Sequence, residues 1–290
     1  MKNRLNISSY RVWCFALFLI LAMSLCLLAA VPKQVMDKPL AEDIRVASAN
    51  AAATPLPIIM YHSIFHKDTG KYVLHPEQLE KDFIYIKNNG YTTIVVKDLI
   101  DFIENGVPLP DKPIMLTFDD GAKTKYLYAF PLLKKYDLRA VFAVVGKWID
   151  DEEVKKGSSL TYEQIKEMAD SGLVEIQSHS YDMHKSKGRV GMRQKKGECE
   201  NEYRQALKED LGRVKDSLND RLGIKVTAVA YPFGAFSDLT NSILRELGYK
   251  AVFICTEKVN FIDKDSDLFN LCRFNRPSGI SSERFFAKLK

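Results

Sequence analysis

Two adjacent aspartates, Asp119 and Asp120, stand where a buried strand is expected to end. The apolar, β-prone run 113–116 leads into Thr117-Phe118 and the two aspartates, and Gly121 follows, which is the pattern of a strand that ends at a turn. Neighbouring strand side chains point to opposite faces, so both carboxylates can share a site only where the strand breaks. Gly121 can adopt the unusual φ of such a break. We interpret the pair as one metal ligand and one proton acceptor; the alternative is a simple helix cap.

Two of the five histidines, His179 and His184, follow another strand-like run at 174–178. On one helix they would diverge, because a helix face recurs every three or four residues. Their spacing instead fits one histidine at a strand end and one across a short loop. Two neutral imidazoles and a carboxylate, with positions left for water, form a hydrolytic site for one divalent metal ion. These ligands suit zinc, and also cobalt, nickel, iron or manganese.

The segments that must position these residues alternate between strand and helix. Alternation predicts a parallel sheet with crossover helices, and roughly 235 residues suit a closed or nearly closed β/α barrel, with an open doubly wound sheet as the alternative. No glycine-rich nucleotide-binding motif is present. Strands are expected at 56–61, 91–96, 113–119, 140–145, 174–178, 226–231, 251–255 and 268–274, and helices at 77–89, 97–105, 126–136, 161–171, 198–222, 239–247 and 282–289.

A barrel gathers its chemistry at the carboxyl ends of its strands. His62 ends the first expected strand, and the turn Pro232-Phe233-Gly234 follows a later one. These two features should therefore lie near the aspartate pair and His179. His66 and His75 fall in a polar loop and are expected to be solvated.

Three motifs resemble those of the polysaccharide deacetylases, which are the NodB-homology or family 4 carbohydrate esterases. They occur in the family's order, within roughly residues 57–277, and a Met-Tyr-His-Ser-Ile start at 60–64 resembles one exported branch. The resemblance implies a distorted (β/α)7 barrel. The motifs are Thr117-Phe118-Asp119-Asp120-Gly121, His179-Ser180-x-x-x-His184 and Tyr231-Pro232-Phe233-Gly234.

Carried over by position, the resemblance implies a role for each motif residue. Asp120, His179 and His184 would hold the metal. Asp119 would be the general base on the attacking water, and the backbone N–H of Phe233 would bind the oxyanion. The reaction would hydrolyse N-acetyl groups of a polysaccharide such as peptidoglycan, a chitin-like chain or an exopolysaccharide.

The sequence departs from the family in its second half. Leu271-Cys272-Arg273 stands where the family has a Leu-x-His motif with the general acid, and the third motif lacks its arginine. The family's fourth-motif tryptophan is missing, because the chain has only Trp13 and Trp148. As substitutes we consider His62 for the acid, and Arg273 or Arg276 for the arginine that orients Asp119; the alternatives are a satisfied buried histidine and a surface ion pair.

These departures leave two other functions open. The chain could be a non-catalytic glycan-binding or wall-binding protein on a partly decayed deacetylase scaffold. It could also be another metal hydrolase on a β/α barrel, such as a phosphodiesterase, although such enzymes usually need ligands for a second metal and we find no second set.

Outside the motifs, the N-terminus carries a targeting signal. Residues 1–31 are basic and then apolar, which predicts a signal peptide or an N-terminal anchor that contacts the membrane, and 32–55 read as a linker before a catalytic domain at 56–290. Three positive charges of the net +5 lie in 1–31, which leaves +2 for the rest of the chain. This small excess does not indicate a basic surface for binding nucleic acid. Cys255 and Cys272 have no paired spacing and are expected to be core residues. The oligomeric state stays open.

Overall fold

The computed structural model describes residues 53–66, 70–151 and 156–289. The expected signal or anchor segment at 1–31 and almost all of the expected linker lie outside the described residues. The first strand, β1 (Thr54–Leu56), begins just before the expected domain start and pairs antiparallel with β11 (Asn260–Ile262). In the part of the chain that is described, no helix combines the length and the apolar character that crossing a bilayer requires.

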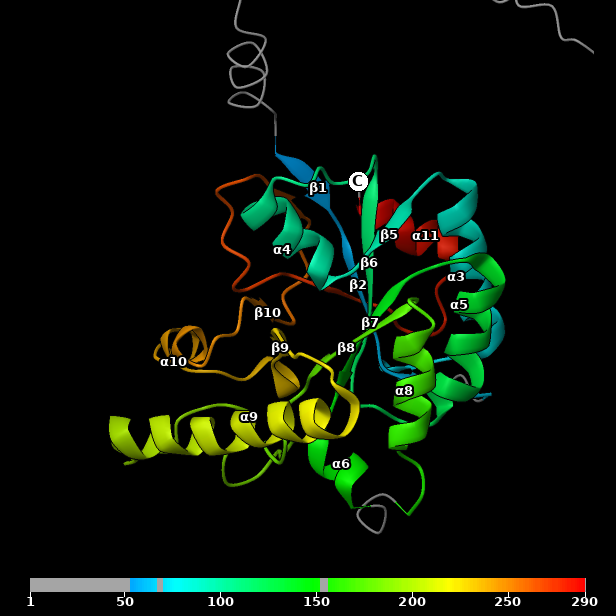
Figure 1. The fold of residues 1–290 in the computed structure, drawn as a ribbon. Helices are drawn as coiled ribbons and strands as arrows, with labels where there is room; N and C mark the ends of the chain where they lie inside the picture. The colour runs from blue at the N-terminus through cyan, green and yellow to red at the C-terminus, as the bar shows by residue number, and fades with distance from the viewer. Residues whose placement is uncertain (1–52, 67–69, 152–155, 290) are drawn as a thin grey trace, which may run out of the picture. The chain divides into compact units, whose positions relative to one another are not determined.

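The centre of the domain is a curled parallel sheet of eight strands (Figure 1). Its strand order is β10-β9-β8-β7-β6-β2-β12, and β5 pairs with the start of β6. The predicted distorted barrel is confirmed in this curled form. The strands are β2 (Ile58–Tyr61), β5 (Thr92–Ile94), β6 (Pro113–Phe118), β7 (Ala140–Val144), β8 (Val174–Ser178), β9 (Ala228–Ala230), β10 (Ala251–Phe253) and β12 (Phe274–Asn275).

The two ends of the sheet are joined by the segment that contains β12. The N–H of Leu271 donates to the carbonyl of Val252 in β10 at 2.7 Å, and the N–H of Arg276 donates to Met60 in β2 at 3.0 Å. The last strand was expected at 268–274, but only Phe274 and Asn275 form a regular strand. The residues just before β12 instead connect β10 to β2. Because these residues are not in a regular strand, their side chains need not alternate between the two faces of the sheet.

Most helices lie around the outside of the curled sheet (Figure 1), whereas the helix at 96–105 packs its Val96 and Leu99 against inward-facing strand residues such as Met115. One expected helix, at 126–136, begins instead as a π-helical turn at Lys125–Ala129 and continues as α5. The helices are α3 (Pro76–Asn88), α4 (Val96–Asn105), α5 (Phe130–Tyr136), α6 (Gly146–Asp150), α8 (Tyr162–Asp170), α9 (Glu200–Leu222), α10 (Thr240–Glu246) and α11 (Ser282–Phe286), with short turns η4 (Pro232–Gly234) and η5 (Ala287–Leu289) and a small sheet of β3 (Ser63–Ile64) and β4 (Val73–Leu74).

Strand side chains alternate between an outer and an inner hydrophobic cluster. In β6, Leu116 and Phe118 belong to the outer cluster with residues of the surrounding helices, whereas Met115 belongs to the inner one. The inner cluster is rich in small residues such as Ala143 and Ala230, which fits a narrow interior. Because Asp119 follows Met115 by four positions, the two-residue period of the strand directs its carboxylate inward.

Two minor expectations about side chains are wrong. Cys255 is exposed and Cys272 is half-buried, so neither is a core residue. His75 is half-buried and caps α3, because its Nδ1 accepts the N–H of Glu77 at 3.3 Å. His66 is exposed, as expected.

Candidate active site

The turn after β6 separates the two aspartates. Asp120 has φ +77° and Gly121 has φ +79°, and the N–H of Gly121 donates to the carbonyl of Asp119 at 3.1 Å. A Cβ on Gly121 would lie 3.2 Å from Val144, a tight contact, so the positive φ and the limited space both favour glycine here. The predicted strand break is therefore present, and both carboxylates face one site although they are adjacent in the chain.

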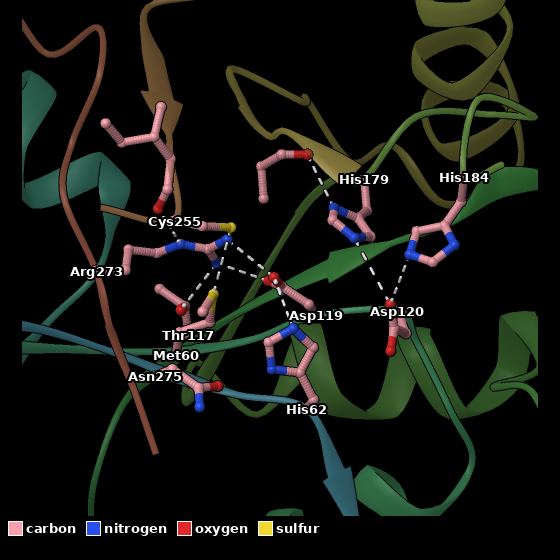
Figure 2. A network of polar contacts seen from close by, with 12 residues as sticks. Met60, His62, Thr117, Asp119, Asp120, His179, His184, Cys255, Arg273 and Asn275 are labelled. Carbon is pink, nitrogen blue, oxygen red and sulfur yellow. Dashed lines mark hydrogen bonds and ion pairs between the residues drawn. The ribbon is translucent and has the colours of Figure 1, made fainter. Parts of the chain in front are cut away.

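Asp120, His179 and His184 meet at the carboxyl ends of β6 and β8 (Figure 2). Nε2 of His184 lies 3.2 Å and Nε2 of His179 lies 3.6 Å from Oδ1 of Asp120. One potential ligand atom from each residue lies within 4.8 Å of the other two. The structure thus brings together the three residues that the sequence selected as metal ligands.

The protonation of His179 decides what this cluster can hold. Its Nδ1 is 2.8 Å from the carbonyl oxygen of Ala230, which can only accept, so Nδ1 carries the proton. Burial lowers the pKa of His179, which keeps the ring neutral and leaves a lone pair on Nε2. That lone pair faces Oδ1 of Asp120, a buried oxygen without a hydrogen-bond partner. Two facing acceptors repel each other unless a cation lies between them, so the donor set fits a divalent metal ion.

Asp119 is held by a buried arginine from the segment just before β12 (Figure 2). Arg273 forms a bidentate ion pair with it, with Nη1–Oδ1 at 2.7 Å and Nη2–Oδ2 at 2.9 Å. Arg273 is 0% and Asp119 1% exposed, so the surface ion pair considered for this arginine is wrong. Burial alone would raise the pKa of Asp119, but Arg273 outweighs it and lowers that pKa to about 2. Asp119 is therefore ionised at neutral pH.

Arg276, the other arginine considered for this position, points elsewhere. Its Nε donates to Oδ2 of Asp82 in α3 at 2.7 Å and its Nη2 donates to Oδ1 at 3.0 Å. Ser282 and Tyr61 also donate to this carboxylate, and both partners of the pair are fully buried. Arg276 thus ties the C-terminal segment to α3, while Arg273 from the same segment reaches the site.

His62 lies beside the carboxylate of Asp119 (Figure 2). Its Nε2 lies 3.8 Å from Oδ2 of Asp119, and its Nδ1 is buried without a hydrogen-bond partner. Burial, partly offset by Asp119, lowers the pKa of His62 to about 4. The alternative of a histidine satisfied by buried hydrogen bonds is therefore wrong, and a neutral imidazole stands next to the carboxylate.

Aromatic rings pack on His184 and on His62 at the edge of the site. Phe233 lies 4.5 Å and Trp148 4.9 Å from the ring of His184, measured between centroids, and Tyr72 lies 4.7 Å from the ring of His62. Phe233 has φ +59°, and the two hydrogen bonds of its turn are donated by its neighbours Gly234 and Ala235. Sequence reasoning missed Trp148; its position just after the carboxyl end of β7 was the signal that could have placed it here.

Comparison with known proteins places this geometry in a family. The family model for polysaccharide deacetylases matches residues 106–252, half of the chain, including β6 and β8 and the site residues that follow them. The chain belongs to the polysaccharide deacetylase family. The motif with Asp119 and Asp120 and the motif with His179 and His184 therefore lie within the matched residues, whereas His62 and Arg273 lie outside them.

Several relatives of this deacetylase domain carry a more specific name. The poly-beta-1,6-N-acetyl-D-glucosamine N-deacetylase of Escherichia coli K12 is 29% identical in an alignment 204 residues long, and this alignment covers 60% of this chain and 30% of that protein. This chain thus spans about a third of that relative. The enzyme of the same name from Staphylococcus aureus MRSA252 is 25% identical, covering 66% of this chain and 64% of that protein. The solved structure of a de-N-acetylase from Aggregatibacter actinomycetemcomitans is 26% identical with a TM-score of 0.70, covering 81% of this chain and 98% of that chain.

Proposed function

We propose that this deacetylase is an exported, metal-dependent enzyme that removes N-acetyl groups from an amino-sugar polysaccharide. The observation that carries the metal dependence is the pair of facing acceptors, Nε2 of His179 and Oδ1 of Asp120, beside an ionised Asp119. The names of the relatives favour a polymer of N-acetylglucosamine as the substrate. Export rests on the basic and then apolar segment 1–31, which would precede a linker at 32–55 and a catalytic domain at 56–290.

In this proposal Asp120, His179 and His184 hold one divalent ion, with zinc as the first choice for such ligands. When bound, the ion would lower the pKa of a water molecule and polarise the acetyl carbonyl. The hydrogen bond from Nδ1 of His179 to Ala230 fixes the tautomer and the orientation of that ligand before the ion arrives. The site is thus preorganised by the backbone of β9.

The remaining residues move the protons. The carboxylate of Asp119 accepts a proton from the attacking water, whose oxygen bonds to the acetyl carbon. The C–N bond then breaks, and the amine nitrogen needs a proton. His62 is neutral and must first receive a proton. Its Nε2, 3.8 Å from Oδ2 of Asp119, is placed to take the proton that Asp119 removed from the water and to pass it to the nitrogen, which returns both side chains to their starting states. The backbone N–H of Phe233 would support the developing oxyanion.

A polymeric glycan is favoured by exposed aromatic rings on the two sides of the site. Phe233 is 51% and Tyr72 49% exposed. One packs on His184 beside Asp120, and the other packs on His62 beside Asp119. Half-exposed rings offer apolar faces on which neighbouring sugar rings of a chain can stack.

Acetate release tests the proposed function directly. Purified protein incubated with N-acetylglucosamine oligomers should release acetate, lose this activity with a chelator, and regain it when zinc or cobalt is added back. Glycan binding without acetate release, with or without added metal, would instead support the decayed-scaffold alternative. Release that is unaffected by complete metal removal would contradict the metal role.

His62 can be tested separately from the metal. We expect His62→Ala to lower kcat by about 10²- to 10⁴-fold, the usual contribution of general acid–base catalysis, without changing the metal content. The matched control is His66→Ala, because His66 is exposed and lies only four residues further along the chain. Unchanged turnover in the His62 variant would remove this residue from the mechanism.

A further inference from the structure

The loop between the two histidine ligands is held by a carboxylate that comes from a distant helix. Asp210, in the middle of α9, accepts the N–H of Tyr181 on Oδ1 at 2.8 Å and the N–H of Asp182 on Oδ2 at 2.7 Å. Both oxygens of one side chain are thus used on two consecutive backbone amides. Hydrogen bonds to an ionised acceptor are about twice as strong as neutral ones, so this contact is a strong restraint on the loop.

The backbone of this loop requires such a restraint. Ser180 has φ +73°, a conformation that a residue with a Cβ adopts only when its surroundings impose it. The carbonyl of Ser180 accepts the N–H of Gly146, and that of Tyr181 accepts the N–H of Lys147, both at 3.0 Å. The start of α6 therefore holds the carbonyl side of the loop, while Asp210 holds its amide side.

The same part of α9 also fixes a side chain of the loop. The guanidinium of Arg213 lies 4.0 Å above the ring of Tyr181, and Asp210, Arg213 and Tyr181 line a hollow of about 840 Å³ beside the site. Burial raises the pKa of Asp210, and its two backbone hydrogen bonds oppose that rise. Burial of the Asp210 carboxylate is thus unfavourable for its charged form, and the hydrogen bonds from the two amides of the loop partly offset this.

We propose that Asp210 is a positioning residue for the metal site. By fixing the amides at 181 and 182, it sets the place of His184 relative to Oδ1 of Asp120, from which Nε2 of His184 is 3.2 Å away. The inference rests on the proposed metal role of His179 and His184. Asp210 itself touches neither the ion nor the substrate.

Metal affinity of the purified protein tests this proposal. We expect Asp210→Asn to weaken the Kd for zinc by about 10- to 100-fold, the usual cost of losing a residue that orients a ligand, because the amide NH₂ turns one acceptor into a donor that faces an N–H. The zinc Kd is measured by competition with a chromogenic chelator on metal-free protein. Asp216→Asn, an exposed aspartate on the same helix, is the matched control and should keep the wild-type Kd.

The outcomes separate this inference from the proposed function. If the wild-type protein binds no divalent metal, the proposed function fails. If the wild type binds zinc and folded Asp210→Asn binds it equally well, the positioning role is overturned, even when the variant melts at a lower temperature. Should Asp210→Asn not fold, Asp210→Glu keeps the charge and moves the carboxylate by one methylene; a weaker zinc Kd then supports the proposal, and a wild-type Kd overturns it.

Discussion

Replacing Asp119 by Asn should nearly abolish deacetylation while metal binding persists. Asparagine has the same shape but cannot accept a proton from water, so we expect kcat to fall by about 10²- to 10⁴-fold. The zinc Kd should not change, because Asp119 is paired with Arg273 and is not one of the proposed ligands. Acetate release at saturating zinc, together with the zinc Kd, checks both parts.

The same substitution removes the charge partner of a fully buried arginine. Breaking a buried ion pair costs about 3–5 kcal/mol, so a loss of activity must be distinguished from a loss of folded protein. Asp82→Asn provides the control, because Asp82 forms another buried bidentate pair, with Arg276, away from the site. Both variants should lose similar stability in urea unfolding at neutral pH, but only Asp119→Asn should lose turnover. Wild-type turnover in the Asp119 variant would contradict its role as the base.

The aspartate motif at 119–120 and the histidine motif at 179–184 could be located from the sequence, because the ends of parallel strands have a predictable place in the sheet. Parallel strands bring their carboxyl ends to one edge, so the residues that follow β6 and β8 lie at the same edge of the sheet, with β7 between the two strands. The glycine also predicted the positive φ of Gly121, whereas the positive φ of Asp120 itself was not predicted.

The choice between Arg273 and Arg276 could not be made from the sequence. The two are three residues apart, so in an extended segment they point to opposite sides, but the sequence does not say which side faces the site. The regular strand between them has only two residues, too few to show a hydrophobic alternation. In the structure, the backbone N–H of Arg276 donates a hydrogen bond to the carbonyl of Met60. This hydrogen bond fixes the register of the segment on β2 and therefore which of the two arginine side chains faces the site.

Asp210 was missed for a related reason. It lies in a long helix that carries many charged residues. Its spacing from Leu207 and Val214 places it beside the buried face of this helix, but that spacing does not say what its carboxylate contacts. Its role depends on contacts with a loop that lies 28 and 29 residues earlier in the chain. Such a tertiary contact leaves no periodic pattern, so only the folded arrangement reveals it.

Replacing Arg273 by Met should cost both stability and activity. Met fills much of the volume but leaves the Asp119 carboxylate buried without its partner, so we expect a loss of about 3–5 kcal/mol at neutral pH. In the wild type, the pKa of Asp119 is lowered from an ordinary 3.8 to about 2, so the pair contributes stability above pH 4 that is lost as the pH falls toward 2. The stability difference between wild type and variant, measured by urea unfolding, should therefore shrink as the pH is lowered over this window.

Without Arg273, burial is no longer outweighed, and the pKa of Asp119 should rise above its ordinary value. The acid limb of the pH profile of kcat/KM should then move to higher pH in Arg273→Met, because the base is protonated at a pH where the wild-type carboxylate is still ionised. Arg276→Met is the matched control: it breaks an equally buried pair and should lose similar stability, but its acid limb should stay at the wild-type pH. Equal pH profiles in the two variants would show that Arg273 acts only in folding, whereas a shift confined to Arg273→Met assigns it to the orientation and charge of the base.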